Sequence, residues 1–266
     1  MAQAVEDAHL DDLDEQAALI AHHWGEAGRA VEAAGWHQRA AEWVTQRDPY
    51  QAAQQWRSVH RLLRDHADDP RSLDLRLQAC MHLTMAAWRV GMAPEEVAEL
   101  FEEGKRLAER ADDSRMLALI TTAYAAWLTA TGESRAGYER HREAHALVHR
   151  LSASDRVLVL LGLQVSSYAT GRLQDAVRLL HELLEIAGDD ATLGMDTVGF
   201  SILCYAAYGF AVQGWLCGRL AEAWRESDRA LALARAHKQT DLLCWGLGLP
   251  AHLAHDTGSE DSQQLD

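Results

Sequence analysis

The sequence predicts an all-α fold, in which antiparallel helix hairpins stack into a right-handed superhelix. Helical periodicity dominates the chain, and no run of residues has the alternation of a convincing strand. Glycines recur where hairpins would turn, and from Gly91 the spacings between successive ones are 41, 39, 47 and 40 residues. A helix–turn–helix unit that repeats with such a period is typical of a solenoid.

Small residues follow several of these glycines at offsets of plus five and plus twelve. The matching sets are Gly28 with Ala33 and Ala40, Gly132 with Gly137 and Ala144, Gly218 with Ala223 and Ala230, and Gly171 with Ala176. Both offsets fall on one face of the helix that follows the turn. We therefore expect that face to let a neighbouring helix approach closely.

The order of the helices follows from this periodicity and from start and stop signals. We expect helices near 11–27, 29–46, 49–66, 71–90, 93–110, 114–131, 134–151, 155–170, 172–187, 195–217, 219–236 and 240–255. Asp48 before Pro49 is a capping residue followed by proline at the first helical position, and Pro70 and Pro94 mark starts of the same kind. The glycines of the repeat series end helices.

From residue 114 onward the helices alternate in character. Met116–Gly132 and Val157–Gly171 carry no charge, whereas the helix expected near 134–151 is rich in arginine and glutamate. Stacked hairpins need this alternation, with one helix layer buried and the other half-solvated. Burial of the apolar layer supplies the driving force, at about 25 cal/mol per Å² of apolar area.

These patterns predict one continuous repeat domain over 11–256, between a disordered acidic N-terminus at 1–10 and a disordered acidic tail at 257–266. Only eight residues follow Gly258, too few for the partner helix of the last hairpin. The pattern therefore suggests a fragment of a longer protein, with a short free-standing repeat protein as the alternative.

Composition restricts the classes of partner. The formal net charge is −15, with 40 acidic and 25 basic residues and no basic stripe, which argues against nucleic-acid binding. The acidic N-terminus lacks the apolar run of a signal peptide. The four cysteines form no C-x-x-C pair and lie in apolar stretches, so we expect reduced core cysteines in a cytoplasmic protein: Cys80, Cys204, Cys217 and Cys244.

One segment is long enough to raise the question of a membrane. Thr197–Gly218 holds 22 residues without a charge. It also contains Ser201, Gln213 and three internal glycines, and it ends at a repeat turn. We therefore expect a helix buried within the stack and no membrane partner.

Two patterns could bind a metal or a ligand. His141, His145 and His149 have the i, i+4, i+8 spacing of one helix face, which could chelate zinc or copper, although a polar, partly packed face is the preferred interpretation. Four aromatic residues precede the turns: Trp88, Trp127, Tyr168 and Trp215. We prefer to interpret them as inter-helix packing residues, and the alternative is that they line a ligand-binding groove. We expect no cofactor and no catalytic residue.

The first sixty residues carry a family resemblance. The segments LDEQAALIAHHWGEAG, RAVEAAGWHQRAAEW and DPYQAAQQWRSVHRLL are similar to the region after the ATPase module of bacterial class III adenylate/guanylate cyclases that carry an AAA-type ATPase. Related tails occur in LuxR-type ATP-dependent transcription activators. The specific match covers about residues 10–66, and the remainder resembles the tetratricopeptide repeat in style, with a period nearer 40 than 34.

The resemblance implies a regulatory or partner-binding platform. The phosphate-binding motif G-x-x-x-x-G-K-[ST] is missing from the sequence. Lys105 does follow Gly104, but the pair lies inside an expected helix and precedes Arg106 in place of serine or threonine. We therefore predict a non-catalytic sensor tail of a cyclase-type signalling ATPase, whose partner is another protein or a neighbouring domain of a larger chain. The alternative is a small-molecule-sensing repeat region of a LuxR-type activator.

Overall fold

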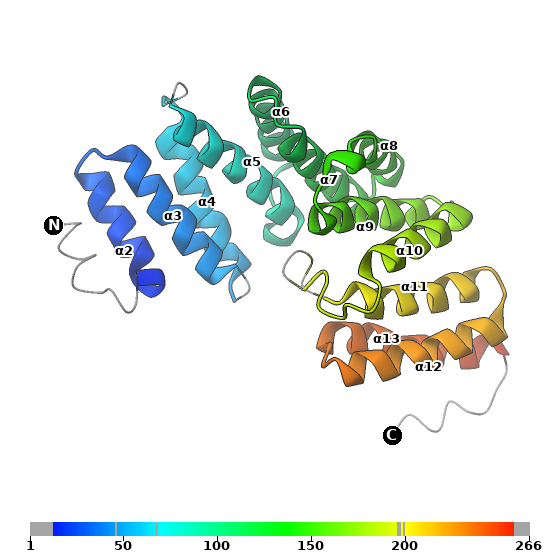
Figure 1. Ribbon diagram of the computed structural model, residues 1–266. Coiled ribbons are helices and arrows are strands. Elements are labelled where there is room, and N and C mark those ends of the chain that lie inside the picture. The colour runs from blue at the N-terminus through cyan, green and yellow to red at the C-terminus, as the bar shows by residue number, and fades with distance from the viewer. Residues whose placement is uncertain (1–12, 46, 67–68, 196–197, 199, 258–266) are drawn as a thin grey trace. The chain divides into compact units, whose positions relative to one another are not determined.

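The computed structural model describes residues 13–45, 47–66, 69–195, 198 and 200–257. These residues form twelve α-helices and one short 3₁₀ helix, with no strand among them (Figure 1), which confirms the predicted all-α class. The helices are α2 (Leu13–Glu26), α3 (Ala30–Val44), α4 (Pro49–Leu63), α5 (Pro70–Val90), α6 (Pro94–Arg110), α7 (Ser114–Ala130), α8 (Ser134–His145), η1 (Val148–Arg150), α9 (Ala153–Ala169), α10 (Leu173–Ala187), α11 (Ile202–Leu216), α12 (Leu220–Ala236) and α13 (Thr240–Thr257).

Local signals explain several helix starts and ends. The Asp48 side chain accepts a hydrogen bond of 3.0 Å from the Gln51 backbone amide, and Pro49 then begins α4. Asp69 caps α5 in the same way through the amide of Ser72. The chain turns through a left-handed glycine after α2, α5, α7, α9 and α11, with φ between 66° and 99°, at Gly28, Gly91, Gly132, Gly171 and Gly218.

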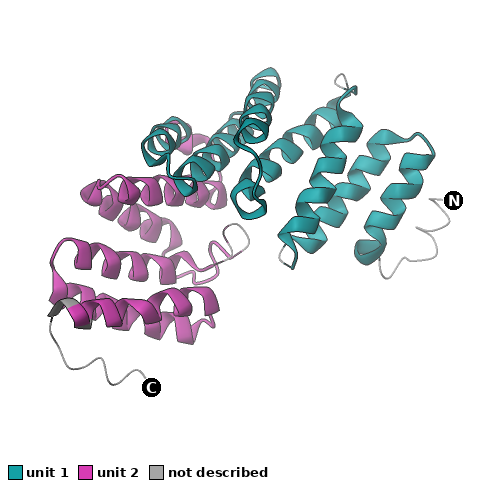
Figure 2. Cartoon of the chain, turned by 180° about the vertical axis from the view of Figure 1, so that it is seen from behind, with its two compact units in different colours: residues 1–144 teal, residues 145–266 magenta. Residues whose placement is uncertain are grey.

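The chain divides into two compact units, residues 1–144 and 145–266 (Figure 2). In unit 1 each helix from α2 to α7 packs against the next along the chain, and α5 also contacts α7. In unit 2 the successive pairs from α9 to α13 pack in the same way. The prediction of one continuous domain over 11–256 stays a prediction. The ends expected to be acidic and disordered are 1–10 and 257–266; of these only Thr257 is described, and it is the last residue of α13.

Each unit has its own apolar interior. Trp56, Phe101 and Ile120 are at most 2% exposed in unit 1. In unit 2 one cluster joins α10 to α13 through Leu180, Tyr205 and Leu242, and a second joins α11, α12 and α13. Burial of these side chains stabilises each unit by removing apolar area from water.

The four cysteines are free, and the structure corrects the expectation that all of them lie in the core. Cys80 and Cys204 are buried, one in each unit, whereas Cys217 and Cys244 are exposed. Cys217 follows the last residue of α11, next to the turn at Gly218, so it lies beyond the packed part of that helix.

Two helices are shorter than expected. The helix predicted over 134–151 ends at His145, and the chain then forms a turn and the 3₁₀ helix η1. The helix predicted from 195 begins at Ile202, where the Ser201 side chain accepts from the Cys204 amide. The connection between α10 and α11 accounts for the longest glycine spacing, 47 residues. No helix in the described part of the chain has the length and apolar character needed to cross a bilayer.

Candidate functional site

The small residues of the repeat series lie in helix–helix contacts. Ala33, Ala144, Ala176 and Ala223 are fully buried, and Ala40 and Ala230 are at most 5% exposed. Gly137 is also buried, and a Cβ atom on it would lie 2.8 Å from the Ala125 carbonyl oxygen. The backbone of α8 therefore lies directly against α7, so a larger residue at position 137 would force these helices apart.

The structure does not gather the three candidate histidines into a metal site. His141 is fully buried, His145 is the last residue of α8, and His149 is exposed in η1. The i+8 spacing requires a helix that continues to 149, and α8 stops four residues earlier. Among the described residues, one group of three ligand side chains could hold a metal ion, and it contains none of these histidines.

The four candidate groove aromatics do not form one site. Trp88 is 50% exposed beside Arg89, whereas Trp127 is buried and stacks on Tyr124. Trp215 stacks on His252. Tyr168 alone of the four lines a cavity of about 100 Å³, which lies in unit 2 between α9 and α11.

This cavity in unit 2 has an aromatic and amide lining. It is formed by Gln164, Val165, Tyr168, Tyr205, Tyr208, Gly209, Val212 and Gln213. The Tyr205 hydroxyl donates a hydrogen bond of 2.7 Å to Gln164 Oε1. Burial raises the pKa of Tyr205, so this hydroxyl stays protonated and acts as a donor.

A second cavity, of about 310 Å³, lies in unit 1 and combines indole rings with guanidinium groups. We call it the Trp–Arg groove, and its lining is Trp24, Glu32, Gly35, Trp36, Arg39 and Arg71. Arg39 lies 5.2 Å from the centroid of the Trp36 ring, and its Nε donates to Asp14 Oδ1. Such a lining offers flat apolar surface and positive charge to a bound group.

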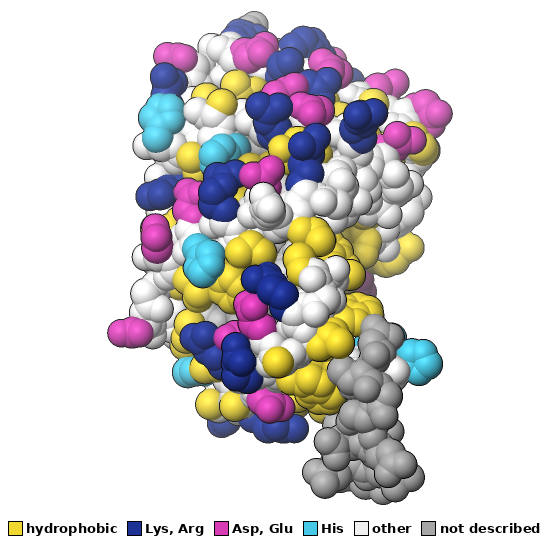
Figure 3. Space-filling model, turned by 90° about the vertical axis from the view of Figure 1, so that its right-hand side faces the viewer, with side chains coloured by type: hydrophobic (Ala, Val, Ile, Leu, Met, Phe, Trp, Pro, Cys, Tyr) yellow, Lys and Arg dark blue, Asp and Glu magenta, His cyan; other side chains and the backbone are white. Residues whose placement is uncertain are grey.

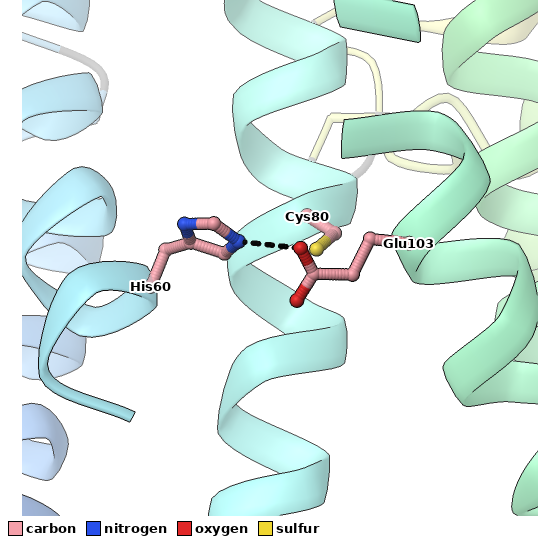
Figure 4. A group of neighbouring side chains, drawn as sticks. All are labelled: His60, Cys80 and Glu103. Atoms are coloured by element: carbon pink, nitrogen blue, oxygen red, sulfur yellow. Dashed lines mark hydrogen bonds and ion pairs between the residues drawn. The ribbon is translucent and has the colours of Figure 1, made fainter. Parts of the chain in front are cut away.

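A polar cluster lies in unit 1, where α4, α5 and α6 meet (Figure 4). His60 Nε2 lies 3.0 Å from Glu103 Oε2, and Arg76 donates to the other carboxylate oxygen at 2.5 Å. The Cys80 sulfur, a His60 nitrogen and a Glu103 oxygen all lie within 4.8 Å of one another. Cys80 is 0% exposed.

The charges of this cluster follow from its contacts. Hydrogen bonds from His60 and then Arg76 lower the pKa of Glu103 to about 2, against the opposing effect of burial. Burial first, and then the charge of Glu103, raise the pKa of the Cys80 thiol. A protonated thiol with no exposed surface is not placed to attack a substrate, so the cluster does not resemble a cysteine hydrolase site.

A cavity of about 430 Å³ opens beside this cluster and is partly lined by it. The lining is Arg57, His60, Arg64, Leu83, Glu96, Glu99, Leu100 and Glu103. An ion pair of 3.0 Å joins Arg57 to Glu96 across it. His60 and Glu103 thus lie between the buried Cys80 and this cavity.

Sequence reasoning missed this cluster. Its members are 20 and 23 residues apart and come from three different helices, so no short motif contains them. Two signals could have found it: His60 and Glu103 are separated by 43 residues, close to one repeat period, and Cys80 lies on the helix between them.

A comparison with known proteins finds no matching family model and no matching curated protein. The resemblance to cyclase-type and activator-type tails therefore stays a prediction.

Proposed function

We propose that the chain is a non-catalytic helical-repeat platform, a solenoid of tetratricopeptide-like hairpins that binds a partner protein. Hydrogen bonds between helices one period apart support the solenoid. Gln38 bonds to Gln78, 40 residues away, and Arg57 to Glu96, 39 residues away. In unit 2 Tyr205 bonds to Gln164 over 41 residues. Contacts at one repeating separation are what stacked hairpins produce, because each repeat touches its neighbours.

The Trp–Arg groove is the observation that carries the binding proposal. Trp24 and Trp36 are half-buried, so part of each indole faces the groove. Arg71 adds a positive charge beside Glu32, and Arg39 adds a guanidinium that pairs with Asp14. Tryptophan and arginine are the residues most enriched among energetic hot spots of protein interfaces. The groove thus suits a peptide segment that carries an apolar side chain next to a carboxylate.

Exposed apolar side chains provide further contact area. In unit 2 they include Leu216, Trp245 and Leu247, each more than 40% exposed. Figure 3 shows one face of the molecule, on which hydrophobic side chains gather between charged ones. Mixed apolar and charged surface of this kind is typical of protein interfaces.

The regulatory context comes from the sequence resemblance. We propose a cytoplasmic sensor tail whose partner is either a neighbouring domain of a larger signalling ATPase, of the cyclase type or the activator type, or a separate protein. In this role the chain needs no cofactor and no catalytic residue of its own.

Affinity capture with matched variants tests this function. Trp36→Ala and Arg71→Glu change the Trp–Arg groove, and Trp88→Ala removes an exposed tryptophan outside it. The expected result is a protein retained by the wild type and by Trp88→Ala, and lost with both groove variants. Titration of that purified protein should then give a Kd that the groove variants weaken at least about tenfold, or about 1.4 kcal/mol. Equal retention by all variants would exclude the groove.

The cavity beside Tyr168 favours a second function, the sensing of a small molecule. Its volume, about 100 Å³, is below the roughly 300–1,000 Å³ of drug-sized sites, so it suits a ligand of few atoms. Saturable quenching of tryptophan fluorescence by a metabolite, abolished by Gln164→Leu, would support this function. No response across a broad panel would argue against it.

A further inference from the structure

We propose that His60, Cys80 and Glu103 form a zinc site in unit 1, with the fourth coordination position directed to the adjacent 430 Å³ cavity. This site is independent of the interaction platform proposed above. It joins three helices, so it would act both as a brace between α4, α5 and α6 and as a point where a ligand from the cavity can reach the metal.

The donor atoms have the chemistry that zinc prefers. Imidazole nitrogen, thiolate sulfur and carboxylate oxygen are the three side-chain ligands that zinc uses in proteins. Three protein ligands with a fourth open position are typical of zinc sites that bind water or a substrate. Figure 4 shows the imidazole of His60 and the thiol of Cys80 directed toward the carboxylate of Glu103.

The spacing of the donors suits a tetrahedral ion. Ligands about 2.0–2.3 Å from zinc at tetrahedral angles lie roughly 3.3–3.7 Å from one another. His60 Nε2 and Glu103 Oε2 are 3.0 Å apart, and all three donors lie within 4.8 Å of one another. Movements of a few tenths of an ångström, up to about one, in side chains from three helices would complete this geometry.

Arg76 supports the carboxylate in a way that leaves the metal position open. Its guanidinium donates to Glu103 Oε1, whereas Oε2 faces His60. Zinc carboxylates commonly keep such a partner on the second oxygen, which fixes the orientation of the ligand. Arg76 is therefore a positioning residue, and the metal would take the place between Oε2 and the imidazole that their present contact occupies.

Binding would exchange a proton for the ion. The Cys80 thiol loses its proton to solvent and forms the sulfur–zinc bond, and Glu103 binds as the carboxylate. His60 binds through Nε2 as the neutral imidazole, so the proton that Nε2 donates to Glu103 moves to Nδ1, or leaves to solvent where the ring carries both protons. No electron is transferred. The stoichiometry is therefore one proton from the thiol for each ion bound, and a second where His60 carries both ring protons.

Cobalt and zinc titrations of the metal-free full-length chain test the site. Co²⁺ reports tetrahedral geometry through its visible absorption, and a cobalt–thiolate bond through a near-ultraviolet band. We expect one ion per chain, displacement of Co²⁺ by Zn²⁺, one to two protons released in weak buffer, and a higher Tm with zinc. A folded wild-type chain with no thiolate band would overturn the proposal.

Variants assign the ligands. Cys80→Ser should abolish the near-ultraviolet band, and His60→Gln should weaken binding, while circular dichroism checks that each variant folds. Cys204→Ser is the matched control, because it changes the buried cysteine of unit 2. If Cys80→Ser unfolds, the wild type is treated with an alkylating reagent in the presence and absence of zinc. Protection of Cys80 by zinc then supports the site, and equal alkylation overturns it. A band lost instead in the Cys217→Ser/Cys244→Ser variant would place the metal on the exposed thiols and overturn the proposal.

Discussion

Tyr205 and Gln164 form a buried hydrogen bond between α11 and α9, in which the phenol donates to the amide oxygen at 2.7 Å. Gln164 is 3% exposed and Tyr205 is 9% exposed. A buried polar pair of this kind contributes modestly when complete, but it is costly when one partner is removed, because the other keeps its desolvation penalty. The pair therefore helps to fix the relative position of α9 and α11, which are not adjacent along the chain.

We expect Tyr205→Phe to lower the free energy of unfolding by about 1–3 kcal/mol, since Gln164 Oε1 loses its donor. The double variant with Gln164→Leu should lose clearly less than the sum of the single variants. Urea unfolding measures all three. Tyr168→Phe, at a 40% exposed tyrosine, is the control and should change stability by less than about 0.5 kcal/mol. Additive single effects would mean that the two side chains do not interact.

A second prediction concerns the plus-five position of α12. Ala223 is fully buried in α12. A Cβ atom added to Gly214 of α11 would lie 3.3 Å from the Cα atom of Ala223, so the two backbones are close. Ala223→Arg should cost several kcal/mol, because the contact with α11 has no room for the charge or the bulk. Ala221→Arg is the control, on the exposed side of the same helix. Thermal melts that shift equally for both variants would mean that the packing register is wrong.

A third prediction compares two helical glycines. Gly137→Ala would place a Cβ atom 2.3 Å from Thr129 Oγ1, so we expect a loss of about 1–3 kcal/mol. Gly25→Ala meets no atom within 4 Å and should stabilise α2 by up to about 1 kcal/mol through helix propensity. Opposite shifts in Tm are expected. Stabilisation by Gly137→Ala would show that α8 does not pack closely on α7.

A fourth prediction concerns acid. Burial lowers the pKa of His141 to about 4, so the unfolded chain binds this proton more tightly than the folded chain. The contribution of His141 to the free energy of unfolding should therefore fall as the pH drops from about 6.5 to about 4, by about 2 kcal/mol at pH 5 and about 3 kcal/mol at pH 4. Well below that pH this histidine adds no further loss.

Chemical denaturation of wild type and His141→Gln at several pH values measures this contribution. The variant should show a flatter slope between pH 6.5 and 4. His149→Gln removes an exposed histidine and should keep the wild-type slope. Identical slopes for wild type and His141→Gln would mean that His141 does not carry the acid sensitivity.

The helical class was predictable because its signals are local. Proline after an aspartate cap and glycine after an apolar run act within one turn, and the structure begins α4 at Pro49 and turns at Gly28 accordingly. The early end of α8 was not predictable in this way. Val148 and Leu151 continue a plausible helical pattern, but the chain instead forms a turn and η1 at the boundary of the two units.

No short sequence motif predicted the candidate site. The three histidines of the 141–149 region had helical spacing, yet His60, Cys80 and Glu103 come together only through the packing of three helices. Likewise, Trp24 and Trp36 share a groove because α2 and α3 pack together, which no spacing rule indicates. A separation near one period, such as that of His60 and Glu103, indicates that two helices are neighbours, but the contact between particular side chains also depends on the helix-crossing geometry.

The distribution of thiols gives the molecule two internal reporters of local opening. Cys80 is sealed in unit 1 and Cys204 in unit 2, so a thiol reagent reaches each one only when its own surroundings open. The labelling rates, followed by peptide mass spectrometry, therefore compare the opening free energies of the two halves within one native chain. Equal rates would indicate that the halves open as one cooperative body, and unequal rates would rank them.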